Sequence, residues 1–221
     1  MQMIIIDGSD DENGYTSGKS ALFHKRVMNP ETESCRKYVR SLNNEHTTVV
    51  LHPSNIGHGR GMDMAIRMCK TPFALIFDSD IVMVKSPVQE MLDMMEEDTY
   101  GVGYLEKTGF DGYEYGAKPH HAHQGFMMMM HPFFHLLQIA NYHKFHRYVH
   151  HGAPCFKAAL DIHNKGLSEK ILKVFPGLGH TGGKGWCWDP VPGEHIKHRT
   201  AGTRTYRTSV GKQEIEQGWE L

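Results

Sequence analysis

The pattern of apolar and polar residues predicts a chain in which short strands alternate with helices. Apolar runs have the length of buried strands, and the segments between them repeat apolar residues at three- and four-residue spacing. Strands are predicted at residues 3–6, 49–51, 73–77, 100–105, 125–130 and 171–175. Helices are predicted at residues 17–43, broken at Asn29-Pro30, and at residues 62–69, 87–97, 132–140 and 154–164. Because helical crossovers connect parallel strands, we expect one α/β domain with a mostly parallel central sheet flanked by helices.

Two segments depart from this alternation. Residues 106–124 are rich in glycine and histidine and are predicted to form a loop. Residues 176–195 contain many glycines and prolines, a composition typical of a loop that closes over a binding site.

Composition narrows the functional class. The 221 residues carry 24 Lys and Arg against 25 Asp and Glu, a formal net charge of −1, which excludes nucleic-acid binding driven by a basic excess. The cysteines stand far apart without a Cys-x-x-Cys pair, which argues against a disulfide scaffold and a cysteine zinc site. Apolar runs are far shorter than the roughly 20 residues of a membrane-spanning helix, and no signal-peptide pattern opens the chain. We therefore expect a soluble, cytoplasmic protein.

The sequence Asp78-Ser79-Asp80 follows the predicted strand at residues 73–77. At the carboxyl end of a strand, where loops diverge, one carboxylate can face a ligand while its neighbour binds metal or water. Carboxylate oxygens suit a hard cation such as Mn²⁺ or Mg²⁺, and such a cation can bridge a diphosphate and stabilise its charge when a bond breaks. The motif therefore predicts a metal site that activates a leaving group.

The residues around this motif resemble the core of glycosyltransferases of the GT-A fold, and most closely family 2. The resemblance is carried by the loop Asn55-Ile56-Gly57-His58-Gly59, the helix after it, and the strand that ends in Asp78-Ser79-Asp80. It implies a Rossmann-like domain with a nucleotide-binding half at about residues 1–105 and an acceptor-binding half at about residues 106–221. It also implies transfer of a sugar from a nucleoside-diphosphate sugar, with a UDP-sugar favoured, to the hydroxyl of a glycan or another acceptor, with inversion.

The same resemblance implies roles for individual residues. Asp7, at the end of the first predicted strand, is expected to contact the base or ribose of the nucleotide, and Asn55, Gly57 and Arg60 are expected to line its pocket. Asp78, Ser79 and Asp80 form the nucleotide-sugar motif. Asp78 and Asp80 are the expected metal ligands, with His198 as the third and His180 and His195 as alternatives.

The proton acceptor for the acceptor hydroxyl is not set by the resemblance, because residues 150–155 lack the family's acidic pair. A histidine can replace it near neutral pH, so His151 is one candidate. Asp111 and Glu114, in the loop after the fourth predicted strand, are the others, and Asp161 is a further alternative. A carbohydrate-binding or nucleotide-sugar-binding protein of the same fold without activity, and a sugar nucleotidyltransferase, are the competing functions.

Overall fold

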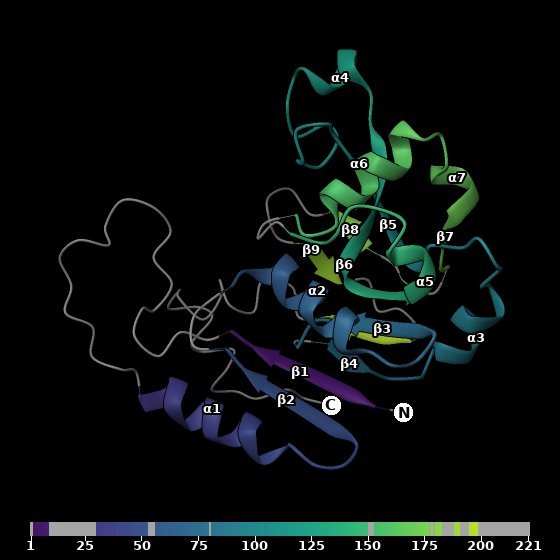
Figure 1. Ribbon diagram of the computed structural model, residues 1–221. Coiled ribbons are helices and arrows are strands. Elements are labelled where there is room, and N and C mark those ends of the chain that lie inside the picture. Colours follow the sequence, from purple (N-terminus) through teal and green to yellow (C-terminus); the bar gives the residue numbers. More distant parts are fainter. Residues whose placement is uncertain are drawn as a thin grey trace.

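The computed structural model describes residues 2–8, 30–52, 56–79, 81–149, 153–176, 178, 180–182, 188–190 and 195–198. Helices and strands are interleaved along the chain and form an α/β architecture (Figure 1). The strands are β1 Met3–Asp7, β2 Thr47–Leu51, β3 Phe73–Phe77, β4 Ile81–Met83, β5 Gly101–Thr108, β6 Met127–Gln138, β7 Leu172–Val174, β8 His180–Gly182, β9 Trp188–Pro190 and β10 Ile196–His198. The helices are α1 Pro30–Ser41, α2 His58–Met68, α3 Val88–Asp93, α4 His121–Gln124, α5 Ile139–Tyr142, α6 Phe156–Asn164 and α7 Ser168–Ile171.

The largest sheet in the described part of the chain is four-stranded and mixed, with the order β3-β6-β5-β7. β6 runs antiparallel to both of its neighbours, and β7 runs parallel to β5. Strands β3, β5 and β7 therefore share one direction, as the strand–helix alternation predicts, but β6 lies between two of them in the opposite direction. β1 and β2 form a separate parallel pair, while β4 pairs with β10 and β8 with β9 as antiparallel pairs.

The prediction of a helix at residues 132–140 is wrong, because β6 continues to Gln138 and only the short α5 follows. Pro132 does not interrupt the strand, since it lies where the register between β5 and β6 shifts. Gly103 is opposite His135, whereas Leu105 is opposite Met130, so β6 has extra residues at this point. A proline, which has no N–H to donate, is tolerated at such an irregularity.

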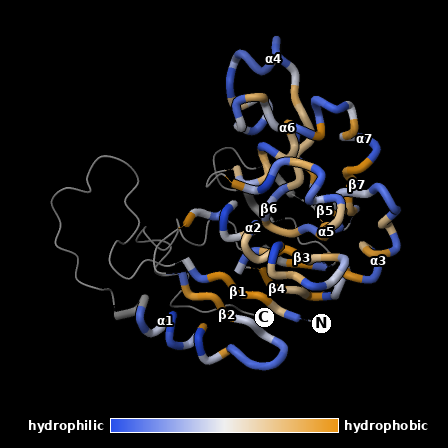
Figure 2. Tube along the Cα trace, viewed as in Figure 1, coloured by the Kyte–Doolittle hydropathy of each residue, from blue (hydrophilic) through white to orange (hydrophobic). Residues whose placement is uncertain are grey.

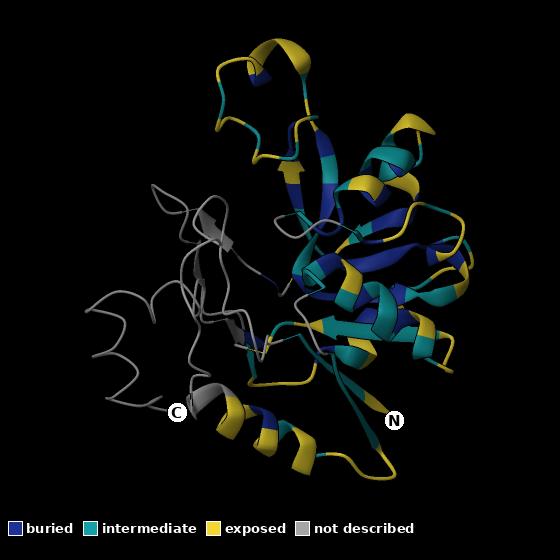
Figure 3. Ribbon diagram, turned by 60° about the vertical axis from the view of Figure 1, so that its left-hand side comes forward, coloured by how far each residue is buried: buried dark blue, intermediate teal, exposed yellow. Residues whose placement is uncertain are grey.

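Apolar side chains cover both faces of the four-stranded sheet. Neighbouring residues of one strand belong to different clusters: Leu137 packs with residues of α2 and α6, and Leu136 packs with residues of α3 and of the segment around Phe175. Because successive side chains of a strand point to opposite faces, the two clusters lie on opposite sides of the sheet. Figure 3 shows that buried residues concentrate in these strands. The central position of β6 explains its nearly continuous apolar sequence.

Beyond this core, β5 and β6 extend as an arm whose tip, residues 109–126, carries α4. The tip is mostly hydrophilic and mostly exposed (Figures 2 and 3). The predicted loop at residues 106–124 corresponds to this tip, although β5 continues as far as Thr108. No helix within the described ranges is long and apolar enough to span a membrane.

Candidate functional site

Asp7 is the last residue of β1 and lies next to the buried guanidinium group of Arg36 on α1. Arg36 Nε is 3.8 Å from Asp7 Oδ2, and the Asp7 side chain is 16% exposed. Arg36 Nη2 also donates a hydrogen bond to the carbonyl oxygen of His52, directly after β2, at 3.2 Å. One arginine therefore connects α1 to the carboxyl ends of both parallel strands. This arrangement holds Asp7 at the strand end where the sequence places it.

Asp78 directly follows β3, and α2 brings His58 against it. The Asp78 N–H donates to the carbonyl oxygen of Phe133 at 2.9 Å, which fixes the backbone at this point. His58 Nε2 is 3.4 Å from Asp78 Oδ1, and the Asp78 side chain remains 29% exposed. The two motifs that are separate in the sequence, around Gly57 and at Asp78, thus meet at one edge of the fold.

Gly57 permits this meeting because it precedes α2 with a φ of 82°, a conformation that favours glycine. α2 begins at His58, so the last two residues of the predicted loop at residues 55–59 are helical. Arg60 lies exposed on the first turn of α2, and Ser79 is exposed beside Asp78. Asn55 and Asp80 lie outside the described residues.

The groups beneath Asp78 are neutral. His135 is fully buried; its Nδ1 donates to the carbonyl oxygen of His131 at 3.0 Å, and its Nε2 accepts from the Tyr148 hydroxyl at 3.3 Å. Burial lowers the pKa of His135 to about 4, although the hydrogen bond to the His131 carbonyl oxygen and the charge of Asp78 both act to raise it. Burial also raises the pKa of the Cys155 thiol. The His135 imidazole and the Cys155 thiol are therefore both uncharged near neutral pH.

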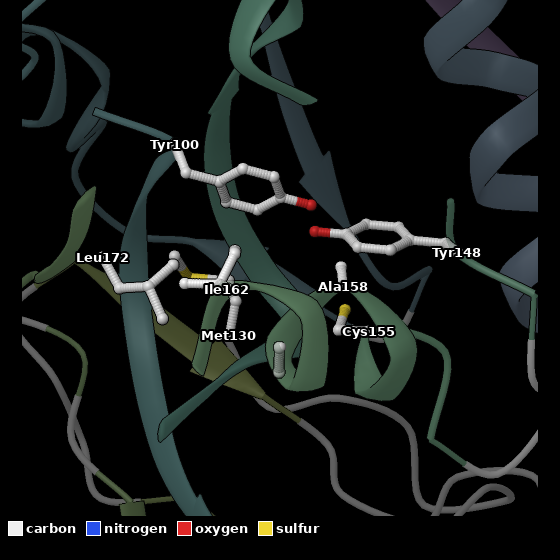
Figure 4. A pocket seen from close by; sticks show the side chains of 8 residues that line it. Tyr100, Met130, Tyr148, Cys155, Ala158, Ile162 and Leu172 are labelled. Atoms are coloured by element: carbon white, nitrogen blue, oxygen red, sulfur yellow. The ribbon is translucent and has the colours of Figure 1, made fainter. Parts of the chain in front are cut away.

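Behind this layer, a set of apolar and aromatic side chains lies between β5, β6 and α6 (Figure 4). The hydroxyl groups of Tyr100 and Tyr148 point toward one another, and Met130 and Ile162 pack beside them. These side chains leave no space for a water molecule between them. This region is therefore core that supports the site, and it is not a substrate pocket.

A second acidic group lies at the same edge of the sheet. Glu106 Oε2 is 4.0 Å from His131 Nε2, and the Glu106 side chain is 10% exposed. Burial, with a smaller contribution from the charge of Glu114, raises the pKa of Glu106 to about 7. His131 is two residues before Phe133, whose carbonyl oxygen accepts the Asp78 N–H, so the Glu106–His131 pair lies farther along β6 toward the arm.

Sequence reasoning missed Glu106, because the predicted strand ended one residue before it. The strand alternation contains the signal: Val102, Tyr104 and Glu106 share one face of β5, and the first two belong to the apolar cluster around Phe133. A carboxyl group in register with inward-facing residues is expected to be buried. The structure confirms this burial.

The three candidates for a third metal ligand differ in their position and in their present contacts. The His198 backbone pairs with Ile81 in β4, the strand that follows the Asp-Ser-Asp motif, so residue 198 is adjacent to this segment. His195 is buried against the ring of Phe175, and its Nε2 is 3.3 Å from a carboxylate oxygen of Glu90. His195 is therefore already engaged in a contact with α3. The backbone of His180 lies in β8, and its side chain is outside the described part.

The predicted proton acceptors for the acceptor hydroxyl also differ in their contacts. Asp111 accepts hydrogen bonds from His120 and His121, and Glu114 forms an isolated bridge with Thr108 near the base of the arm tip. Although desolvation acts to raise the pKa of Asp111, hydrogen bonds from the Tyr113 N–H and from these two histidines lower it to about 2. Asp161, on α6, forms an ion pair with Lys165, directly after this helix, with 3.1 Å between Oδ1 and Nζ. His151 lies outside the described residues.

Comparison with known proteins identifies the family. The family described as "Glycosyl transferase family 2" matches residues 28–162, which include β2, α2, β3 and the whole β5–β6 arm. A search among curated proteins returns no match for the chain. Because the family match spans more than half of the chain, the protein belongs to glycosyl transferase family 2 and has the Rossmann-like GT-A type of fold.

Proposed function

We propose that this glycosyltransferase takes a sugar from a UDP-sugar, with a divalent metal ion, and transfers it with inversion to an acceptor hydroxyl. Family membership supports glycosyltransferase activity in general, with a nucleotide-sugar donor and an acceptor. The observation that carries the finer proposal is the contact of Asp78 with His58, since it joins the two motifs expected to bind the donor.

The residues near Asp78 fit a hard divalent cation. The Asp78 carboxylate is partly exposed, and the polar groups beneath it include the neutral His135. Asp78, Asp80 and His198 would hold Mn²⁺ or Mg²⁺, with two carboxylates as the ligand type that such ions prefer. A bound ion would offset the negative charge that grows on the departing diphosphate.

The donor nucleotide is proposed to lie between the ends of β1 and β3. Asp7 would contact its base or ribose, while Asn55, Gly57 and Arg60 would line the pocket and Ser79 would face it. Gly57 lacks a side chain, so the backbone before α2 can approach a ligand closely. The N-terminus of α2 at His58 also favours negative charge, which suits a diphosphate beside Asp78.

In the proposed reaction, the acceptor oxygen forms a bond to the anomeric carbon of the sugar while the bond from that carbon to the diphosphate breaks. The hydroxyl proton moves to a protein base. A base works best when its pKa is near the working pH, so Glu106, with Glu114 beside it, fits this role better than Asp111. His151 remains the alternative among the predicted groups.

Calorimetric titration of UDP, and of GDP for comparison, with and without Mn²⁺, tests the donor site. We expect UDP to bind only with Mn²⁺, and Asp78→Asn to abolish this binding. Asp93→Asn, which changes an exposed aspartate on α3, is the matched control and should bind as the wild type does. Absence of metal-dependent nucleotide binding in the wild type would overturn the proposal. Nucleotide binding without hydrolysis of any UDP-sugar would instead support a binding protein of the same fold.

A further inference from the structure

Three potential metal ligands converge at the tip of the arm, away from Asp78. His120 Nε2 donates to Asp111 Oδ2 at 2.9 Å, and His121 Nε2 donates to Asp111 Oδ1 at 3.0 Å. One ligating atom from each residue lies within 4.8 Å of the others. Asp111 lies in the loop before α4, and His120 and His121 lie at the start of α4. Their hydrogen bonds to Asp111 therefore connect the beginning of the arm tip to this helix.

The surrounding residues hold two of these ligands in place. His121 is 1% exposed, and its ring stacks on Tyr115 with centroids 5.8 Å apart and planes at 13°. It also lies directly against Gly109, where an added Cβ would come within 2.4 Å of Nε2. The Tyr113 N–H donates to Asp111 Oδ1 at 3.2 Å. His120, 46% exposed, completes the cluster from the solvent side.

We propose that Asp111, His120 and His121 form a binding site for Zn²⁺ or a similar divalent transition metal. Two imidazole nitrogens and one carboxylate oxygen match the ligands that Zn²⁺ takes in proteins, whereas Mg²⁺ prefers oxygen ligands throughout. With bonds of about 2.0–2.2 Å in a tetrahedral arrangement, ligand atoms lie roughly 3.4 Å apart. The two imidazole nitrogens now contact different oxygens of Asp111, at 2.9 and 3.0 Å, and one ligating atom of each residue lies within 4.8 Å of the others. Adjustment of the side chains would bring the three atoms to the distances of a metal site. Three protein ligands leave one position for water.

Metal binding requires a change of tautomer at both histidines, because the Nε2 proton of each now faces Asp111. At His120, which is 46% exposed, water can accept the proton that moves to Nδ1. The buried His121 needs an acceptor within the protein. Its Nδ1 now accepts the Gly116 N–H at 3.1 Å, so the proton is on Nε2, which faces Asp111. When Nε2 binds the metal, the proton moves to Nδ1 and needs an acceptor there. The peptide between Tyr115 and Gly116 can supply its carbonyl oxygen by turning over. Gly116 is exposed and has a φ of 94°, and as a glycine it has the conformational freedom for this rotation.

The proposed site differs from the Asp78 site in metal preference and in its need for nucleotide. Zinc would bind at the arm without UDP and would brace the tip that carries Glu114. The Asp78 site is expected to take Mn²⁺ and to bind it more strongly with nucleotide present. The two sites can therefore fail or succeed independently in experiments on the full chain.

The test is titration of the chelator-treated 221-residue chain with Zn²⁺ by calorimetry, and with Co²⁺ by visible absorption, both without nucleotide. We expect one site whose affinity falls at least about tenfold in Asp111→Asn and in His120→Gln. His123→Gln, an exposed histidine on the same helix α4, is the matched control and should leave the affinity unchanged. Asp78→Asn should also leave it unchanged.

Circular dichroism of each variant checks that the fold is kept, and the exposed position of His120 makes His120→Gln the safest of them. The proposal is overturned if the wild type binds neither metal, or if His120→Gln and His123→Gln bind Zn²⁺ with the same affinity. It is also overturned if Asp78→Asn alone removes the binding, since the ion would then belong to the donor site.

Discussion

Glu106 is a buried carboxyl group, and its burial makes ionisation unfavourable in the folded state. The substitution Glu106→Gln measures how much this ionisation lowers the free energy of unfolding. Its pKa rises from 4.5, the value of an ordinary glutamate, to about 7, mainly because burial removes the carboxylate from water. A difference of this size corresponds to about 3 kcal/mol between the two protonation states. His131 Nε2, at 4.0 Å, is too distant to supply a full hydrogen bond.

The direction in which the free energy of unfolding changes with pH follows from how the folded and unfolded states bind the proton of Glu106. The unfolded chain loses this proton near pH 4.5, whereas the folded chain holds it until about pH 7. The contribution of Glu106 to stability is therefore fully present below pH 4.5 and is lost as the pH rises through 7. Glutamine has the shape of the protonated glutamate and does not titrate. We expect Glu106→Gln to match the wild type at pH 4.5 and to exceed it by up to about 3 kcal/mol at pH 8.5.

Urea denaturation followed by circular dichroism at both pH values measures this difference. Glu97→Gln, at an exposed glutamate, is the control and should show no comparable dependence on pH. If the stability difference between Glu106→Gln and the wild type is the same at both pH values, burial of the carboxylate does not cost what the geometry indicates. A variant less stable than the wild type at pH 8.5 would show that the carboxylate has a strong favourable partner.

Other substitutions and reagents test the core. Tyr142→Phe is expected to lower the free energy of unfolding by about 1–3 kcal/mol, measured by urea denaturation, because the buried Tyr148 N–H and a carboxylate on α2 lose their partner. Gly103→Ala should lower the melting temperature measurably, since its Cβ would come within 2.6 Å of a Cβ on β6; an unchanged temperature would contradict the packing at the register shift. Alkylation analysed by peptide mass spectrometry should modify exposed Cys35 in the native protein and buried Cys155 only after denaturation.

The sequence predicts best those elements whose local pattern agrees with their final environment. β3 coincides with the predicted strand at residues 73–77, because a continuous apolar run bounded by Thr71-Pro72 and Asp78 leaves one interpretation. The helix at residues 62–69 is confirmed as the main part of α2. The predicted helix at residues 87–97 is shortened to α3, and the broken helix at residues 17–43 corresponds, in its described part, to α1.

The sequence fails where a distant partner decides the outcome. Residues 132–138 have apolar side chains on every face, so periodicity does not separate a buried helix from a central strand, and Pro132 argues for a helix start. Only pairing with β3 on one side and β5 on the other selects the strand. The sequence does not reveal the cluster of Asp111, His120 and His121 for a similar reason. A histidine-rich loop is visible in the sequence, but which of its histidines face one carboxylate depends on how the loop folds over Gly109.

The place of β6 in the sheet has a consequence for synthesis of the chain. Residues 127–138 emerge from the ribosome about 50 residues after β3, yet they supply the strand that β3 needs and the carbonyl oxygen that holds Asp78. The β5–β6 hairpin can form as soon as it is made, because its strands are close in sequence. Until then β3 lacks the pairing that β6 provides, and its unpaired backbone groups are a template for aggregation. A fragment ending near residue 105 would therefore keep the donor motifs but lack the strand that assembles them.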